Sequence, residues 1–307
     1  MVREKVGGRT AIKYGVLFSS TLLMIIFVIA LITVSSAQNV GDIEDFDEMQ
    51  PVPNTAFDGP VEDLMPDKID FQSTVDEWAK TITGSRSVLI YDLDRDEVAG
   101  AYNSSENYII DSLYKLFVVY EGYRRVQSGE WTSSDLVGYT DYTVLDCLDL
   151  AIRESNSVCA ETLWSMIGED ELDQIVKDDF GITNSDVSSF VSNVEDIAKM
   201  MKIYYRHKEI KDDSLVTRMK DSFLNQPVTE YDWRQGLPKG FSIANVYNKV
   251  GWDYNVDGKY WNTYHDAAIV EFPEEDRHFI VVVMTSHVPF SKISNLGSMI
   301  ESAFKAS

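Results

Sequence analysis

Segments with strand character lie at both ends of residues 70–307, and segments with helix character fill the middle. Residues 87–91 (SVLIY) and 97–102 (EVAGAY) are predicted to be two strands, and Asp92–Asp96 between them predicts a turn. Three more strand segments follow towards the C-terminus, at 243–252, 260–272 and 278–287. Strands at both ends with helices between them imply one α+β domain, whose terminal segments share an antiparallel sheet.

The helices are predicted from apolar residues that recur three or four positions apart. Residues 70–83 carry such a stripe, and so do residues 112–127, where Gly129 marks the end. The stripe of the second segment consists of Leu113, Leu116, Phe117, Tyr120 and Tyr123. The remaining expected helices are 143–154, 158–167, 193–206, 213–224 and 291–305.

The N-terminal segment 14–37 contains no charged residue and, at about 1.5 Å per residue, is long enough to cross a bilayer. Basic side chains precede it in 1–13, so the positive-inside rule leaves those residues in the cytoplasm and the rest of the chain outside. A cleaved signal peptide is the alternative, because Ser35-Ser36-Ala37 is an acceptable cleavage site. We expect a membrane anchor with an extracytoplasmic domain at 70–307, or a secreted domain if the segment is cleaved.

Residues 38–69 form an acidic segment that contains four prolines and only one basic residue, Lys68. Such a composition buries too little apolar surface to fold alone, so we interpret it as an extended, self-repelling linker. The whole chain has a net charge of -23. This charge argues against a nucleic acid as partner.

Cys147 and Cys159 are the only cysteines, and they flank an expected break between two helices. In an exported protein they can form a disulfide across that break. Two buried free thiols are the alternative, since the sequence gives no geometry.

Ser112-Leu113-Tyr114-Lys115 opens the helix at 112–127. A serine hydroxyl is a poor nucleophile at neutral pH, but a lysine one helical turn away lies on the same face. If burial and nearby positive charge keep that lysine neutral, it can accept the serine proton. The tetrad Ser302-Ala303-Phe304-Lys305 has the same pattern, and we interpret it as the solvated face of the last helix.

Two more motifs follow the first tetrad in order: Ser155-Asn156-Ser157 at a helix break, and Lys249-Val250-Gly251 on a strand. Together they resemble the S-x-x-K, S-D-N and K-T-G motifs of serine β-lactamases and penicillin-binding proteins. The segments 234–238 (RQGLP) and 266–270 (DAAIV) resemble stretches of class A β-lactamases. The resemblance covers residues 70 to 307. It implies an α/β/α sandwich, with a five-stranded antiparallel sheet, a helical subdomain and a site in the cleft between them.

The resemblance also implies a role for each matched residue. Ser112 is the acyl-accepting nucleophile, and Lys115 accepts its proton. Ser155 relays a proton to the leaving nitrogen, while Lys249 supplies positive field that keeps Lys115 neutral and attracts a substrate carboxylate. The backbone N–H groups of Ser112 and Trp252 form the oxyanion hole, beside Gly251.

Three positions depart from the family pattern. Ser157 replaces an asparagine, which weakens the contact to the substrate's acylamide oxygen, and Val250 replaces a hydroxyl residue, unless its side chain faces away from the substrate. The stretch 181–193 contains no glutamate to activate a deacylating water. Glu195 follows it, and we interpret Glu195 as a partner of the helix dipole, with deacylation base as the alternative.

These observations predict a serine acyl-enzyme hydrolase of the class A β-lactamase type, which acts on β-lactam amides and releases the acyl group slowly. The alternatives are a D-alanyl-D-alanine carboxypeptidase-like enzyme and a degenerate module that only binds the cell wall. The predicted partner is a β-lactam or a D-Ala-D-Ala peptide-like small molecule. We expect a monomer without a cofactor.

Other motifs are compatible with different chemistry. Asp92, Asp94 and Asp96 form D-x-D-x-D, and residues 253–258 resemble the start of a calcium loop, but both also suit hairpin turns. His265-Asp266 could belong to a Ser-His-Asp triad, although no G-x-S-x-G motif accompanies it. We therefore predict no metal site.

Overall fold

The computed structural model describes residues 66–226, 234–253 and 262–307. Its centre is a five-stranded antiparallel sheet with the spatial order β2-β1-β7-β6-β5. The strands are β1 (Ser85–Asp92), β2 (Glu97–Tyr102), β5 (Asn245–Asp253), β6 (Thr263–Phe272) and β7 (Arg277–Ser286). β1 from the start of the domain pairs with β7 from its end, so both ends share one sheet, as the sequence predicts.

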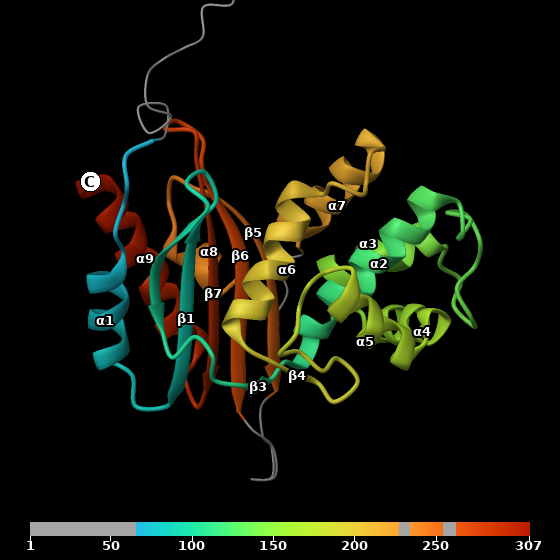
Figure 1. Cartoon of the computed structure of the whole chain (residues 1–307), viewed down its shortest axis with the longest axis horizontal. Coiled ribbons are helices and arrows are strands. Elements are labelled where there is room, and N and C mark those ends of the chain that lie inside the picture. Colours follow the sequence, from blue (N-terminus) through green and yellow to red (C-terminus); the bar gives the residue numbers. More distant parts are fainter. Residues whose placement is uncertain (1–65, 227–233, 254–261) are drawn as a thin grey trace, which may run out of the picture. The chain divides into compact units, whose positions relative to one another are not determined.

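One face of the sheet is covered by α1 (Gln72–Lys80) and α9 (Phe290–Ala306), which lie side by side (Figure 1). The short helix α8 (Leu237–Gly240) contacts α9 and β5. Aromatic residues dominate this layer: the rings of Phe272 and Phe304 stack with centroids 3.7 Å apart. Phe279 makes edge-on contacts with both rings.

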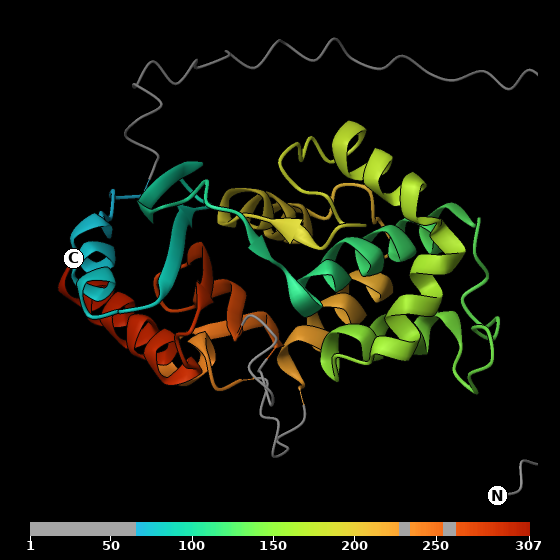
Figure 2. The ribbon, with the colours of Figure 1, turned by 90° about the horizontal axis from the view of Figure 1, so that it is seen from below.

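The opposite face carries α6 (Val194–Arg206), with a helical subdomain beyond it (Figures 1 and 2). The subdomain contains α2 (Tyr114–Ser128), α3 (Val144–Arg153), α4 (Ser157–Ile167), α5 (Glu169–Asp178) and α7 (Asp213–Leu224). Successive residues of β7 serve the two layers alternately, since strand side chains point to opposite faces. Ile280 and Val282 face the subdomain, while Phe279 and Val281 face α1 and α9. The domain is therefore the expected α/β/α sandwich.

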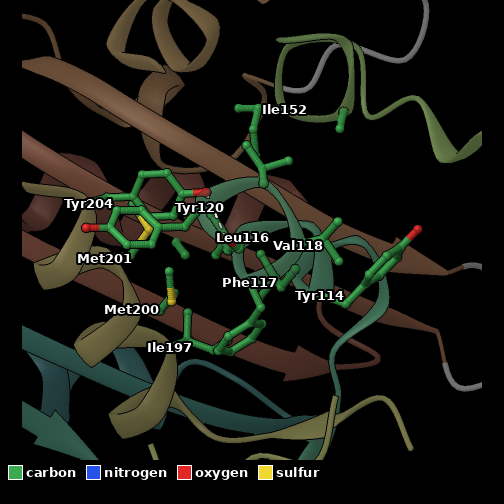
Figure 3. Close-up of a cluster of buried hydrophobic side chains, with 14 of the residues drawn as sticks. Tyr114, Leu116, Phe117, Val118, Tyr120, Ile152, Ile197, Met200, Met201 and Tyr204 are labelled. Atoms are coloured by element: carbon green, nitrogen blue, oxygen red, sulfur yellow. Dashed lines mark hydrogen bonds between the residues drawn. The ribbon is translucent and has the colours of Figure 1, made fainter. Parts of the chain in front are cut away.

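Helix α2 runs through the middle of the subdomain core (Figure 3). Leu116, Phe117 and Val118 are fully buried, and so are most of the residues that follow them on α2. Tyr204 of α6 donates a hydrogen bond from Oη to the Leu116 carbonyl, 2.8 Å away. Because α2 is packed on all sides, it is a rigid support for the residues at its N-terminus.

The predicted helix at 112–127 differs at its start, because Asp111–Leu113 form a 3₁₀ turn and α2 begins at Tyr114. Helix α5 was not predicted, because its first turn is acidic and only two of its side chains, Leu172 and Val176, are buried. Two residues are too few to show a helical apolar stripe. The two-residue strands β3 (Tyr108–Ile109) and β4 (Val191–Ser192) were also not predicted. Their pairing depends on the tertiary fold, because two residues carry no periodicity.

Ser302 and Lys305 of the tetrad at 302–305 are exposed, as expected, whereas Phe304 is buried. Ser302 donates to the Ser298 carbonyl, and Lys305 pairs with Glu301 at 2.6 Å. The aspartates of the β1–β2 turn contact basic side chains, with Arg277 on Asp92, His278 on Asp94, and Lys202 and Arg206 on Asp96.

The apolar segment 14–37 and most of the loop at 253–258 lie outside the described residues. Within the part of the chain that the structure describes, no helix is long and apolar enough to cross a membrane.

Candidate active site

Ser112 lies in the 3₁₀ turn between β3 and α2. The turn is held from two sides: the Ile110 N–H donates to the Phe190 carbonyl, and the Thr263 hydroxyl of β6 donates to the Asp111 carboxylate. Asp111 has a φ of 44°, in the left-handed region that an aspartate tolerates better than most side chains. Burial raises the pKa of Asp111 to about 6. The backbone on the N-terminal side of Ser112 is thus fixed by its neighbours.

Lys115 lies one turn after Ser112 and is fully buried. Its Nζ donates to Ser112 Oγ at 3.0 Å, to Ser155 Oγ at 3.2 Å and to Ser157 Oγ at 3.1 Å. The Ser155 carbonyl oxygen is a fourth acceptor at 2.7 Å, so four acceptors share the three N–H groups of the charged amine. The first two sequence motifs therefore meet at one amine.

Ser155 and Ser157 lie at the break between α3 and α4. The Asn156 side chain caps α4 by accepting a hydrogen bond from the Cys159 N–H, and Ser155 has a φ of 53°. A disulfide joins Cys147 of α3 to Cys159 of α4, with Cα atoms 4.8 Å apart. The cap and the disulfide hold the break in place, so that the Ser155 hydroxyl faces Lys115.

Lys249 reaches the same hydroxyl from β5. Its Nζ donates to Ser155 Oγ at 2.9 Å and to the Val250 carbonyl at 2.9 Å. Strand alternation puts Val250, which is 1% exposed, on the face opposite Lys249. Its lack of a hydroxyl therefore removes no side-chain contact from the site.

Gly251 brings β5 close to the Ser112 turn. A Cβ on Gly251 would lie 2.7 Å from the Ile110 carbonyl oxygen and 3.2 Å from the Leu113 nitrogen. Only glycine fits at this distance, and Trp252 follows it on the same strand. The structure thus brings together six residues that the three motifs select: Ser112, Lys115, Ser155, Ser157, Lys249 and Gly251.

The two lysines have lowered pKa values. Burial lowers the pKa of Lys115 to about 8, and the charge of Glu161 partly opposes this shift. Burial lowers the pKa of Lys249 well below its usual range, and repulsion from Lys115 adds to the effect. Both amines contact Ser155 Oγ, so two positive charges would lie close together. One of the two lysines therefore loses its proton readily. Burial is the main reason that Lys115 becomes a proton acceptor, and the field of Lys249 that the resemblance implied is not among the causes of its lowered pKa.

Glu195 and His265 make contacts of a different kind. Glu195 accepts a hydrogen bond from the Ser104 hydroxyl at 2.6 Å and lines a cavity between α6 and the β1–β2 hairpin. His265 donates from Nε2 to the Ile109 carbonyl at 2.7 Å, and its Nδ1 accepts from the Thr285 N–H. Burial lowers the His265 pKa to about 4. Neither ring nitrogen remains to serve Ser112 as a base.

An aromatic cluster adjoins the site, and the sequence motifs do not reveal it. The ring centroids of Tyr114, Trp164 and Phe190 lie 5.2 to 5.5 Å apart and join α2, α4 and the 181–193 loop. Glu161 lies on α4 between Ser157 and Trp164. The spacing of these three residues, at i, i+4 and i+7, is a signal that could have identified Glu161 from the sequence.

A sequence model described as the beta-lactamase enzyme family matches residues 70–301. Among solved structures, a β-lactamase from Chitinophaga pinensis is 15% identical, with a TM-score of 0.65 over 76% of this chain and 98% of its own. An ancestral class A β-lactamase of Gram-negative bacteria is 17% identical, with a TM-score of 0.66 over 76% of this chain and 100% of its own.

The structure of PBP-A is 16% identical, with a TM-score of 0.64 over 79% of this chain and 100% of its own. At these identities the structural matches show the fold. Among curated proteins, none is significantly similar in sequence.

Proposed function

Because the chain belongs to the beta-lactamase enzyme family, we propose that it is a serine hydrolase that forms an acyl-enzyme with β-lactam amides. One observation carries the proposal: the Lys115 Nζ is buried and lies 3.0 Å from Ser112 Oγ. This is hydrogen-bond distance between a base and its nucleophile. The same amine contacts Ser155, so one chain of hydrogen bonds links Ser112, Lys115, Ser155 and Lys249.

Acylation follows from this chain of contacts. Ser112 Oγ attacks the carbonyl carbon of the amide, and its proton passes to neutral Lys115. Ser155 Oγ, between the two amines, hands a proton to the leaving nitrogen and recovers one from Lys115. Lys249 also donates to Ser155 Oγ, and a substrate carboxylate bound nearby would favour the charged form of its amine.

The oxyanion is assigned to the backbone N–H groups of Ser112 and Trp252. The close approach that Gly251 allows supports this assignment, since it brings β5 to the Ser112 turn. Two donors fixed by the fold need no rearrangement as charge develops, and removing one such donor typically costs about 100-fold or more in rate.

We assign release of the acyl group as the slow step. The 181–193 loop offers no glutamate, and its Asp186 accepts hydrogen bonds from the backbone of Ser189 and the hydroxyl of Ser188. A D-alanyl-D-alanine carboxypeptidase-like activity is the second candidate, and the likeness to PBP-A supports it. A non-catalytic module that binds the cell wall is the third, and the intact Ser–Lys–Ser–Lys contacts argue against it.

Intact-mass measurement of the purified full-length chain with a penicillin tests the proposal, with Ser112→Ala measured in parallel. We expect an adduct that depends on Ser112 and persists for many minutes. An adduct that disappears within seconds would contradict slow release. No adduct with a penicillin, but one with a D-Ala-D-Ala ester, would favour the carboxypeptidase-like activity.

We also propose that residues 14–37 anchor the protein and leave the hydrolase domain outside the cytoplasm as a monomer. The support comes from the sequence of residues 1–37 alone. Cell fractionation, with protease added to intact cells, tests the location. A chain found in the soluble cytoplasmic fraction would contradict it.

A further inference from the structure

One face of helix α4 lies along the site. Ser157, Glu161 and Trp164 are spaced at i, i+4 and i+7, so they share this face of the helix. Contacts fix both ends of the face. Ser157 Oγ accepts a hydrogen bond from Lys115 at 3.1 Å, and the Trp164 ring lies 5.2 Å from that of Tyr114. Glu161, between them, therefore faces the region between Lys115 and the aromatic cluster.

Electrostatics agree with this position. The negative charge of Glu161 opposes the effect of burial on the pKa of Lys115. Burial raises the pKa of Tyr114, and the charge of Glu161 raises it further. Glu161 itself is exposed to solvent, so it keeps access to water. No ion pair joins Glu161 to a basic group of the described residues, so its carboxylate is not neutralised in a salt bridge.

The aromatic cluster next to this face contains two buried polar atoms that have no hydrogen-bond partner among the described residues: Tyr114 Oη and Trp164 Nε1. Both side chains are more than nine-tenths buried. The Ser157 hydroxyl is near enough to Tyr114 Oη to oppose the rise in its pKa, although no hydrogen bond of ordinary geometry joins the two groups. Buried donors without a partner are costly, and a bound water satisfies them. A water bound there would lie on the side of the cluster that the Glu161 face of α4 borders.

We propose that Glu161 is the general base that activates this water for hydrolysis of the Ser112 acyl ester. The assignment rests on the proposed function and names the base that the 181–193 loop lacks. The water oxygen bonds to the acyl carbon while its proton passes to the Glu161 carboxylate. The carbon–Oγ bond then breaks, and the proton returns to Ser112 Oγ by way of the Lys115 amine. Because Glu161 is exposed, solvent water hydrates its carboxylate and makes it a weaker base for the attacking water. Slow release of the acyl group is consistent with this exposure.

The test separates acylation from release in the full-length chain. Parent, Glu161→Gln and the matched control Glu77→Gln are acylated with a penicillin, freed of excess reagent and followed by intact mass. Glu77 is an exposed glutamate of α1, on the far side of the sheet. We expect acylation at the parent rate or slightly faster in Glu161→Gln, with release slowed about 100-fold or more. We expect both rates of Glu77→Gln to equal those of the parent.

Each other outcome overturns the assignment. Equal release rates in Glu161→Gln and the parent, or a parent adduct that never releases, would exclude Glu161 as the base and leave the proposed acylation intact. Slower acylation with unchanged release would make Glu161 a group that acts on Lys115 instead. No adduct in the parent would remove the proposed function itself. As a second readout, Glu161→Ala is treated with formate, a small carboxylate that we expect to restore release.

Discussion

The face of the sheet that α1 and α9 cover is built around aromatic and aliphatic side chains, whereas the face towards α2 and α4 buries two lysines. On the first face, the buried Asp266 accepts hydrogen bonds from the Leu237 N–H and from Asn248. On the second, Lys115 and Lys249 have hydroxyl and carbonyl acceptors, but no carboxylate of the described residues lies within 4.0 Å of either amine.

The comparison separates what stabilises the domain from what performs its chemistry. Burying an ammonium group without a counter-ion is costly, and left-handed backbone at Asp111 and Ser155 adds strain of about 1 to 3 kcal/mol each. The aromatic face also buries a carboxyl, but Asp266 accepts two hydrogen bonds, and the rest of this face is mainly apolar. We infer that it stabilises the fold enough to support the strained site on the other face.

The largest expected effect is that of Lys115→Met. Without the amine, Ser112 has no base, so we expect acylation to slow by about 100- to 10,000-fold. Because a buried ammonium is replaced by an apolar side chain of similar length, the free energy of unfolding should stay the same or rise. Adduct formation by intact mass and urea unfolding measure the two quantities. A variant that is acylated at the parent rate would refute the role of Lys115.

The opposite pattern is expected for Phe279→Ala on the aromatic face. Phe279 is fully buried against Phe71, Phe272 and Phe304. Removing the ring should lower the free energy of unfolding by about 3 to 5 kcal/mol. The acylation rate per folded molecule should not change, since the side chain points away from Ser112. If that rate fell more than a few-fold, the two faces would not be independent.

The disulfide should contribute an intermediate effect. Cys147 and Cys159 are 12 residues apart, and a loop of that size is worth about 3 kcal/mol in the chain-entropy model. We expect the double variant Cys147→Ser, Cys159→Ser to lose about that much stability in urea unfolding. It should also acylate more slowly, because Ser155 follows the break that the disulfide holds. Unchanged stability would show that helix packing alone fixes α3 against α4.

The sequence predicted the sheet and the motif residues because both depend on local patterns. Strand segments with β-branched side chains and three short motifs are visible in the chain itself, and the five-stranded sheet of the β-lactamase fold is confirmed. What local patterns could not show was how β3 and β4 pair.

The surroundings of each motif residue also could not be predicted from the sequence. Burial as the main cause of the lowered Lys115 pKa, and Glu161 beside it, depend on α4 packing against α2. The spacing from Ser157 to Glu161 is present in the sequence. It becomes informative only when the contacts of Ser157 and Trp164 are known.

The smallest expected effect is the pH dependence of acylation. Only neutral Lys115 can accept the Ser112 proton, and the pKa of Lys115 is lowered to about 8. The acylation rate should therefore rise with pH and level off above 8, and it should fall about tenfold per unit below 8. Stopped-flow or quenched mass measurements between pH 6 and 9 give this profile. Phe279→Leu should show the parent profile, since the aromatic face does not contact the lysines. A profile that is flat over this range would mean that Lys115 is already neutral at pH 6, and that Lys249 retains the shared proton.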